Sequence, residues 1–406
     1  MPLPAVLALY LYDDATARTF EPFALTRPAS ELRAGTELIR RRWEQALGAS
    51  AAGFVGAAHL ADFEELDAPP AAPAVLPAGS ILANARAIVA LERTAATDAS
   101  VWTCDGRVAA VRLAEPLAVE RLGNGATALE SLAGGPAALA VSLDGRWVDE
   151  VWDFIGQLGA QLAADIAAIA PTLDTQPHDA PVIGDAAAVY VERGATIDPF
   201  VVFDTTAGPI LVRRGATVQS FTCVVGPCCI GAGATVVGDR ISGCSIGEGS
   251  RIHGEISATI VLGHANKSHD GFVGHSYLGR WVNLGAGTTT SNLKNTYGTV
   301  ALWTPSGVRS SGLQFLGTFF GDHAKVGIGM RLTTGTVVGA GANVYDCMPP
   351  KMVAPFAWGA EPPYGTYDVE KFLVVAAHVM SRRHVTLGDG GRRQLRAAYE
   401  RAAQGR

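Results

Sequence analysis

One histidine and two asparagines lie close together in a glycine-rich stretch of the second half of the chain. His275 comes first, and Asn283 and Asn292 flank a small segment around Ala286. An imidazole, with an ordinary pKa of about 6.5, can accept a proton from an amine near neutral pH. Amide side chains donate to carbonyl, hydroxyl or phosphate oxygens, and small residues let a ligand approach the backbone. These residue types predict proton transfer beside a polar substrate; the alternative is a structural histidine with asparagines stacked along a repeat.

Lysines are scarce, and two of them flank this histidine. The chain has five lysines, of which Lys267 and Lys294 lie on either side of His275. Each could hold a phosphate group as a point charge, and the alternative is that both are solvated surface lysines. His264 and His269 add two imidazoles nearby. No cysteine or second set of ligands accompanies them, so no metal site is predicted.

Any phosphate site in the first part of the chain must use arginine. Residues 1–266 contain no lysine, and the segment DDATARTFEPF after the first apolar run contains no glycine. Arg27 and Arg33 are the candidate ligands, because a guanidinium group binds phosphate oxygens in a bidentate way. Asp13 and Asp14 could hold Mg²⁺ or could simply form a turn.

The elements that would carry these residues differ between the two halves of the chain. Residues 6–12 form a short apolar run that predicts a buried strand, and residues 29–47 and 149–170 show helical spacing of apolar residues. We therefore expect an α/β domain over 1–170, followed by a Pro-rich linker at 171–181.

Beyond this linker the hydrophobic period changes to six. An aliphatic residue recurs at every sixth position, a small residue often follows four positions later, and glycine is frequent between them. This is the hexapeptide repeat of a parallel β-helix, expected over 182–348 and interrupted at 261–272 and 292–315. A Pro-rich exit and two helices are expected over 349–406. The in-phase aliphatics are Val212, Val218, Val224, Ile230, Val236, Ile246, Ile252, Leu278, Leu284, Val326, Leu332, Val338 and Val344.

The stretch GHSYLGRWVNLGAGTTTSNLKNTYG (274–298) resembles the acetyltransferase domain of the bifunctional bacterial N-acetylglucosamine-1-phosphate uridyltransferase/glucosamine-1-phosphate acetyltransferase family. The resemblance implies a left-handed β-helix, His275 as general base, sugar-phosphate contacts from Asn283 and Asn292, and an acyl carrier at the backbone of Ala286. It also implies a homotrimer with sites between subunits. That family has about one hexad more between the histidine and the asparagine segment.

The segments FEPFALTRPASELRAG (20–35) and ANKSHDGF (265–272) resemble a closer group, the shorter sugar nucleotidyltransferase-like proteins with a hexapeptide C-terminal domain. This resemblance implies a Rossmann-like nucleotidyltransferase fold for residues 1–170. It also implies that Asn84, in SILANARAI, contributes to substrate binding. Mg²⁺ would be needed if this domain is active.

Composition excludes several classes of function. The 406 residues are 48% hydrophobic and 17% charged with a net charge of −6, so the chain can bury two cores and has no broad basic surface for nucleic acid. No uninterrupted apolar run is long enough to predict a membrane span, and the N-terminus does not resemble a signal peptide. The six cysteines form no disulfide framework, which indicates reduced thiols and a cytoplasmic protein.

These observations favour a two-domain transferase. The reaction predicted from the resemblance is acetyl transfer from acetyl-CoA to an amino-sugar phosphate, with or without nucleotidyl transfer from an NTP to a sugar-1-phosphate. One alternative is a sugar-1-phosphate nucleotidyltransferase whose β-helix serves only assembly. Another is a non-catalytic regulator that binds a nucleotide sugar.

Overall fold

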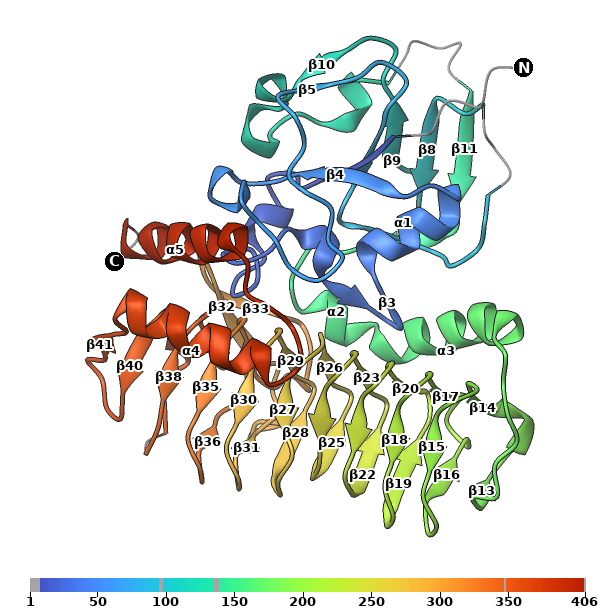
Figure 1. The fold of residues 1–406 in the computed structure, drawn as a ribbon, viewed down its shortest axis with the longest axis vertical. Helices are drawn as coiled ribbons and strands as arrows, with labels where there is room; N and C mark the ends of the chain where they lie inside the picture. Colours follow the sequence, from blue (N-terminus) through green and yellow to red (C-terminus); the bar gives the residue numbers. More distant parts are fainter. Residues whose placement is uncertain (1–7, 95–97, 134–138, 347, 405–406) are drawn as a thin grey trace. The chain divides into compact units, whose positions relative to one another are not determined.

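The computed structural model describes residues 8–94, 98–133, 139–346 and 348–404, and Figure 1 shows its fold. The chain forms two compact units. The first contains Thr26–Val151, the residues before Glu21 and Leu387–Gln404; the second contains Glu21–Leu25 and Trp152–Thr386. No helix in the described ranges is both long and apolar enough to cross a membrane.

The first unit is built on a six-stranded mixed sheet. Its strand order is β11-β8-β9-β6-β1-β4, and β9 runs antiparallel to both of its neighbours whereas β1 runs parallel to β4 and β6. All four residues of β1 are buried, as the apolar run predicted. The strands are β1 (Leu9–Tyr12), β4 (Ala51–Val55), β6 (Ile81–Asn84), β8 (Val101–Cys104), β9 (Arg107–Arg112) and β11 (Ala140–Leu143). Shorter pairs are β2 (Arg33–Ala34) with β3 (Glu37–Leu38), β5 (Val75–Leu76) with β10 (Leu117–Ala118), and β7 (Ala87–Val89) with β12 (Gly145–Trp147).

The helix expected over 29–47 is shorter in the structure. Only α1 (Ile39–Leu47) is α-helical, and the β2–β3 hairpin precedes it. Gly35 has a φ of 63°, which allows the hairpin turn that breaks the expected helix. Gly48, with a φ of 63°, ends α1 in the left-handed conformation that favours glycine.

The second unit is a parallel β-helix with three faces (Figure 1). The first face consists of β13 (Val182–Ile183), β16 (Val202–Asp204), β19 (Thr222–Val225), β22 (Asp239–Ser242), β25 (Glu255–Ser257) and β28 (Phe272–Gly274). The second face consists of β14 (Val189–Val191), β17 (Ile210–Val212), β20 (Cys228–Ile230), β23 (Ser245–Ile246), β26 (Ile260–Val261), β29 (Tyr277–Leu278), β34 (Phe319–Phe320), β37 (Val337–Val338) and β39 (Met352–Val353). The third face consists of β15 (Thr196–Ile197), β18 (Thr217–Val218), β21 (Thr235–Val236), β24 (Arg251–Ile252), β27 (Asn266–Lys267), β30 (Asn283–Leu284), β35 (Lys325–Val326), β38 (Asn343–Val344), β40 (Ala357–Gly359) and β41 (Gly365–Thr366).

The predicted hexad positions form the core of this β-helix. The aliphatic residues point inward and are buried, and the small residues Ala216, Cys228 and Ala234 are 0% exposed beside them. Burying each such valine or isoleucine contributes about 1.5–3 kcal/mol relative to leaving it exposed. The hexapeptide prediction is therefore confirmed, and the adjacent Cys228 and Cys229 lie within β20. The strands β39 and β40 continue the second and third faces beyond the expected Pro-rich exit at 349.

Of the two expected interruptions, one is wrong and one is confirmed. Residues 261–272 are not an extruded loop, because β27 pairs with β24 and β30 and continues the third face. Lys267 takes the inward position in β27, where it pairs with Ile252. Because a lysine occupies a position that is aliphatic elsewhere, the hydrophobic pattern does not reveal the repeat here. Residues 292–315 do leave the coil and carry the hairpin of β32 (Ala301–Thr304) and β33 (Gly307–Ser310). β31 (Thr289–Thr290) precedes this excursion and pairs with β36 (Arg331–Leu332).

The helices expected near 149–170 and in the C-terminal region are confirmed. The first is divided into α2 (Asp153–Gly156) and α3 (Leu158–Ile169), and α3 packs on the second face at β20. The C-terminal pair is α4 (Val369–Ser381) and α5 (Asp389–Gln404), of which α4 belongs to the second unit and α5 to the first. The Asp368 side chain caps α4 by accepting a 2.9 Å hydrogen bond from the backbone N–H of Lys371.

Candidate functional site

His275 lies at the corner of the β-helix between β28 and β29. Its backbone has a φ of 49°, in the left-handed region that side-chain-bearing residues rarely adopt. The backbone N–H donates to the carbonyl of Ser257 at 2.8 Å, and its carbonyl accepts from the N–H of Gly317 at 2.8 Å. Backbone hydrogen bonds to both neighbouring coils therefore hold this unusual conformation in place. They fix the point on the backbone from which the imidazole extends.

The imidazole of His275 has two side-chain neighbours, both from the excursion over 292–315. Its Nδ1 lies 2.8 Å from Nδ2 of Asn292, and its ring stacks on Phe315 with 5.2 Å between centroids and 25° between planes. Burial lowers the pKa of His275, because a partly desolvated ring resists protonation. The ring is consequently neutral at pH 7 and able to accept a proton.

Which nitrogen of His275 is basic depends on the Asn292 amide. With Nδ2 donating to Nδ1, the neutral ring carries its proton on Nε2. Rotating the amide by 180° brings its oxygen to the ring, places the proton on Nδ1 and leaves Nε2 as the basic atom. Asn292 and His275, both predicted from the sequence, are thus brought together, and Phe315 joins them without having been predicted.

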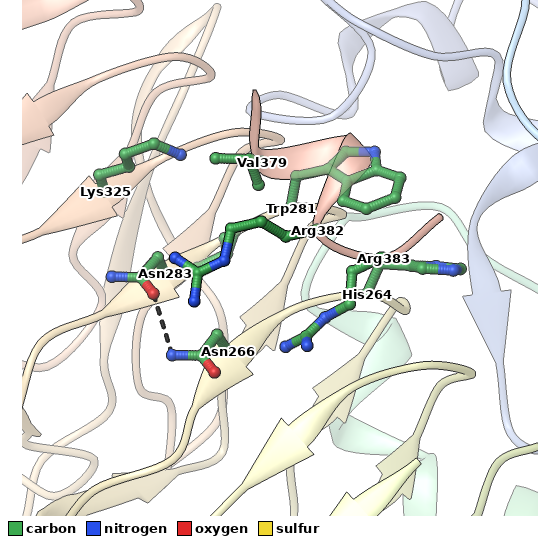
Figure 2. Close-up of a pocket in the computed structure, with 9 residues that line it drawn as sticks. His264, Asn266, Trp281, Asn283, Lys325, Val379, Arg382 and Arg383 are labelled. Atoms are coloured by element: carbon green, nitrogen blue, oxygen red, sulfur yellow. Dashed lines mark hydrogen bonds between the residues drawn. The ribbon is translucent and has the colours of Figure 1, made fainter. Parts of the chain in front are cut away.

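Asn283 and Ala286 lie away from this pair. Asn283 stands on β30 of the third face, where its Oδ1 accepts a 2.9 Å hydrogen bond from Nδ2 of Asn266 (Figure 2). Ala286 follows at the next corner, and its carbonyl accepts from the N–H of Gly329 at 2.7 Å. His275 lies at the corner between the first and second faces, whereas Asn283 and Ala286 lie on and after the third face. These three predicted residues therefore do not meet within one chain.

The two predicted phosphate-binding lysines are both engaged by backbone carbonyls. Lys267 is 0% exposed, and its Nζ donates to the carbonyls of His269 and Asp270. Burial lowers its pKa to about 8. Lys294 is half-buried in the excursion, where its Nζ donates to the carbonyl of Thr299 at 2.5 Å. The interior position of Lys267 makes it part of the β-helix core, and we do not include it in the proposed site.

A pocket of about 270 Å³ opens at the carboxyl ends of β1 and β6 in the first unit. Asn84, predicted as a binding residue, lines it together with Asp14, Arg86 and Arg107. Asn84 Nδ2 donates to Asp14 at 2.9 Å, and Arg86 donates to the same carboxylate at 2.7 Å. Ligands of open α/β sheets bind where the carboxyl ends of parallel strands meet, so this pocket is in the expected place.

The cations of this pocket were not predicted. Arg86 and Arg107 both lie over the ring of Trp147, with 5.2 Å and 3.8 Å from the guanidinium carbon to the ring centroid, and both pair with Asp149. The position of Arg86 just after Asn84 was a signal available in the sequence. Arg107 offered none, because it comes from the antiparallel strand β9.

Arg27 and Arg33 are buried rather than presented to this pocket. Arg27 is 2% exposed and pairs with Glu65 at 2.9 Å, and Arg33 is 5% exposed and donates to the carbonyl of Thr36. Asp13 is also buried, where both of its oxygens accept from the N–H of Ala29, and desolvation raises its pKa to about 7. The two acids after β1 therefore face different partners.

The residues at this strand end do not fit a resident Mg²⁺. Asp13 is turned into the interior, and the oxygens of Asp14 are taken by Asn84 and Arg86. The arginine and the amide lower the pKa of Asp14 against the opposing effect of burial. A magnesium ion would have to displace the guanidinium group, so no step is derived through Mg²⁺ here.

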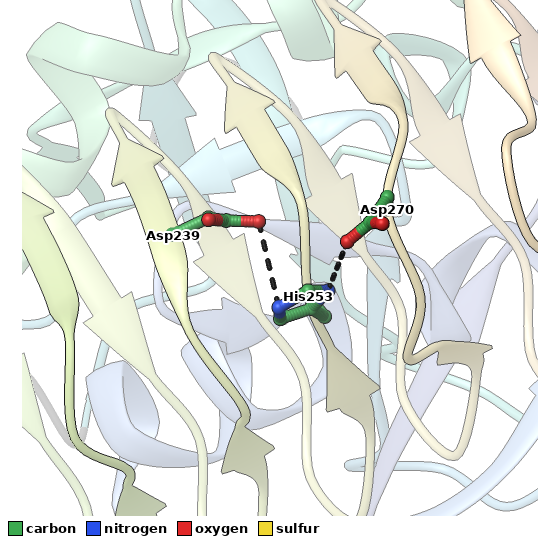
Figure 3. Close-up of side chains that lie close together, drawn as sticks. All are labelled: Asp239, His253 and Asp270. Atoms are coloured by element: carbon green, nitrogen blue, oxygen red, sulfur yellow. Dashed lines mark ion pairs between the residues drawn. The ribbon is translucent and has the colours of Figure 1, made fainter.

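One group of possible metal ligands occurs among the described residues, Asp239, His253 and Asp270 (Figure 3). The imidazole Nε2 lies 3.4 Å from Asp239 and the Nδ1 lies 3.3 Å from Asp270. The two carboxylates also raise the pKa of the nearby Lys267 against desolvation, so they already face a cation. His264 Nδ1 accepts a hydrogen bond from Arg280 Nη1 at 3.1 Å, and its ring packs on Trp281.

The described cysteines are reduced thiols. Cys104, Cys223, Cys228, Cys229 and Cys244 form no disulfide, and Cys347 lies outside the described residues. Burial raises the pKa of Cys104 to about 11 and that of Cys244 to about 12, so neither thiol offers a nucleophile at neutral pH.

Comparison with known proteins gives relatives for parts of the chain. Residues 9–172 match the family described as "Sugar nucleotidyl transferase". The bifunctional sugar-1-phosphate nucleotidylyltransferase/acetyltransferase of Sulfurisphaera tokodaii is 32% identical over 91 residues, which make up 22% of this chain and 23% of the relative. The match thus spans less than a quarter of that relative's length.

Two solved structures of the N-acyltransferase AntD from Bacillus cereus are also similar. One is a variant in complex with dTDP and coenzyme A, and the other is in complex with dTDP and 3-hydroxybutyryl-CoA. Both share 11% identity, cover 52% of this chain and 98% of the other, and have TM-scores of 0.21 and 0.20. The family match makes residues 9–172 similar to sugar nucleotidyl transferases, and a parallel β-helix follows them in the same chain.

Proposed function

We propose that this protein is a sugar-phosphate transferase of the bifunctional type, which acetylates an amino-sugar phosphate with acetyl-CoA at His275. The observation that carries this proposal is the His275–Asn292 pair at 2.8 Å, held at a β-helix corner and covered by Phe315. A neutral, oriented imidazole of lowered pKa is what amine acylation requires of a general base. The domain match over 9–172 supports a sugar phosphate as the acceptor class.

In this reaction the amine nitrogen attacks the thioester carbonyl and forms the new C–N bond. His275 accepts the proton that the nitrogen loses, through Nε2 when the Asn292 amide presents its oxygen to Nδ1–H. The C–S bond then breaks, and the proton passes from the imidazolium to the leaving thiolate. Asn292 and Phe315 set the tautomer and the tilt of the ring, so they act as positioning residues.

A second reaction is favoured by the pocket at the end of β1. There an oxygen of a sugar-1-phosphate would attack the α-phosphorus of an NTP, with pyrophosphate as the leaving group. Arg86 and Arg107 line the pocket and could stabilise the negative charge that spreads over the phosphate oxygens. Asn84 and Asp14 would hold Arg86 in position through the bonds they make with it.

The test measures thiol release from acetyl-CoA and pyrophosphate release together, over a panel of sugar-1-phosphates, amino-sugar phosphates and NTPs. His275→Ala should lower thiol release by about 10²–10⁴-fold, the usual contribution of a positioned base, and leave pyrophosphate release unchanged. His378→Ala, an exposed histidine on α4, is the matched control and should keep both activities.

Other outcomes select the alternatives. Pyrophosphate release without thiol release from any amino sugar would indicate a nucleotidyltransferase whose β-helix serves assembly. Tight nucleotide-sugar binding without either release would indicate a regulator. Full thiol release by His275→Ala would exclude the acetyl-transfer mechanism proposed here.

A further inference from the structure

A row of polar side chains runs along the outside of the third face. Strand register aligns Arg251 with Asn266, Asn266 with Asn283, Asn283 with Lys325, and Lys325 with Asn343. Each of these residues except Asn266 directly precedes an inward aliphatic residue. Successive strands lie about 4.8 Å apart. The row is therefore a ladder of nitrogen-bearing groups that extends over several coils.

The end of α4 closes this ladder into a pocket of about 280 Å³ (Figure 2). Arg382, at the C-terminal cap of α4, extends over Asn266 and Asn283 in Figure 2. Lys325 lies farther along the same face, and Trp281, which lines the pocket, is 0% exposed. The lining residues are His264, Asn266, Trp281, Val282, Asn283, Lys325, Val379, Arg382 and Arg383.

The positive charges of this pocket have no carboxylate beside them among the lining residues. The Nζ of Lys325 is buried and makes no hydrogen bond. Its pKa falls to about 8 through desolvation, with no acid opposing the shift. The pKa of Arg383 is lowered by burial and by the charges of Arg251 and Arg382, again with no acid opposing it.

Three buried arginines elsewhere in the described chain are paired with carboxylates. Arg40 lies 2.6 Å from Glu31, Arg86 lies 2.7 Å from Asp14, and Arg280 lies 2.6 Å from Glu248. Burying a charge without a partner is costly, and that cost is offset when a counter-charge binds. In the third-face pocket, by contrast, cations converge and no lining residue supplies an anion.

We propose that this pocket binds the phosphate groups of a diphosphate-bearing ligand. Arg382 and Arg383 approach from α4, Lys325 and the two asparagines approach from the strands, and every one of these groups can donate to phosphate oxygens. Two adjacent phosphates match donors that are spaced along a ladder better than a single phosphate does. The site stands on the third face and does not rest on the function proposed for His275.

The same chemistry is offered by inorganic pyrophosphate, by coenzyme A and by a nucleoside-diphosphate sugar. Isothermal titration of the full-length protein with each of the three compares these sources. We expect at least one to bind with a Kd below about 1 mM, with affinity falling steeply as salt is added. Tighter binding of coenzyme A or of the sugar nucleotide than of pyrophosphate identifies the source of the diphosphate.

Two variants test the pocket residues, and two others serve as controls. Arg382→Gln alters an exposed side chain and should leave the fold intact, whereas Lys325→Met removes the buried ammonium at similar length. Each substitution should raise the Kd of the ligand at least tenfold. Arg331→Gln, at an exposed arginine on β36, should leave the Kd unchanged. Binding that is equal in wild type, Arg382→Gln and Lys325→Met overturns the proposal, as does the failure of all three ligands to bind wild type. His275→Ala should bind like wild type, which separates this site from the acetyl-transfer corner.

Discussion

At the residue scale, burial separates the side chains that can meet a ligand from those that serve the fold. His275 and Asn292 share a hydrogen bond at a partly open corner, whereas Lys267 and Arg27 are buried with partners inside the protein. The sequence identified all four as candidates from residue type. Type alone could not tell them apart, because the direction of a side chain depends on its position in the coil or on its neighbours in the domain.

We expect Asn292→Asp to raise the pKa of His275, because a carboxylate beside the ring stabilises the imidazolium. The base must be neutral to act, so the acidic limb of the pH profile of kcat/KM should move to higher pH. In wild type this limb should lie below the ordinary histidine value, since burial lowers the pKa of His275. Profiles for acetyl transfer by the two proteins provide the measurement. Superimposable acidic limbs would show that Asn292 does not control the ring.

Lys267→Ala should destabilise the protein without changing its affinity for a sugar phosphate. The substitution leaves a cavity in the prism and deprives buried carbonyls of their donor, at a cost of about 2–4 kcal/mol. Urea denaturation and steady-state kinetics on one preparation would test this. An increased KM at unchanged stability would instead restore the phosphate-binding role that the sequence suggested.

Lys325 should make stability depend on pH in the alkaline range. Its pKa is about 8 in the folded protein against 10.5 for the free group, so the unfolded chain binds more protons between these values. The free energy of unfolding should therefore rise as the pH increases from about 8 to about 10.5. Lys325→Met should remove part of this rise, and Lys267, which shares the shift, accounts for another part. An identical pH dependence in Lys325→Met and wild type would contradict the assignment.

At the element scale, the repeat was predictable because its rule is simple and its violations are few. Every inward aliphatic from Val212 to Val236 is buried as its spacing required. The prediction of a loop around Lys267 was wrong because a lysine takes an inward position there. The prediction of a helix from residue 29 was wrong over its first part because Gly35 allows a hairpin. The pocket under α4 could not be predicted, since it joins coils and a helix that are distant in the sequence.

The corner that carries His275 should be sensitive to a single methyl group at Gly317. A Cβ there would collide with the carbonyl oxygen of Gly274 and the hydroxyl of Ser276. Gly317→Ala should therefore lower the free energy of unfolding by about 1–3 kcal/mol and reduce acetyl transfer through the displaced imidazole. Gly298→Ala is the matched control, because its nearest neighbour would lie 3.8 Å away. Equal thermal melts for the two variants would refute this account of the corner.

At the scale of the whole molecule, one chain does not bring all predicted acetyl-transfer residues together. Asn283 and Ala286 stand apart from His275, and large apolar side chains are exposed, among them the stacked pair Phe200 and Phe221 at 71% and 77% exposure. Exposed apolar groups of this size favour association with another copy. The resemblance to hexapeptide acyltransferases implied sites that are shared between subunits.

We therefore expect a homotrimer with a mass near three times 42.2 kDa. Light scattering coupled to size exclusion, over a range of micromolar concentrations, would measure it. A wild-type protein that stays monomeric throughout while retaining acetyl transfer would show that one chain is sufficient.

The three-faced cross-section also means that the face on which a residue lies depends on how many hexads precede it. Adding or removing six residues advances every later side chain to the next face, whereas eighteen residues return it to the same one. His275 and Asn292 are about one full revolution apart, which is why they touch, but Asn283 is out of phase with both. The acetyltransferases that this chain resembles have about one hexad more between the histidine and the asparagine. In this chain Asn283 therefore lies one face, or a third of a turn, away from the position that the motif would give it relative to His275. In β-helix enzymes, the role of a residue in a relative should therefore be assigned to the residue on the same face of the coil, even where the sequence motif aligns with a different one.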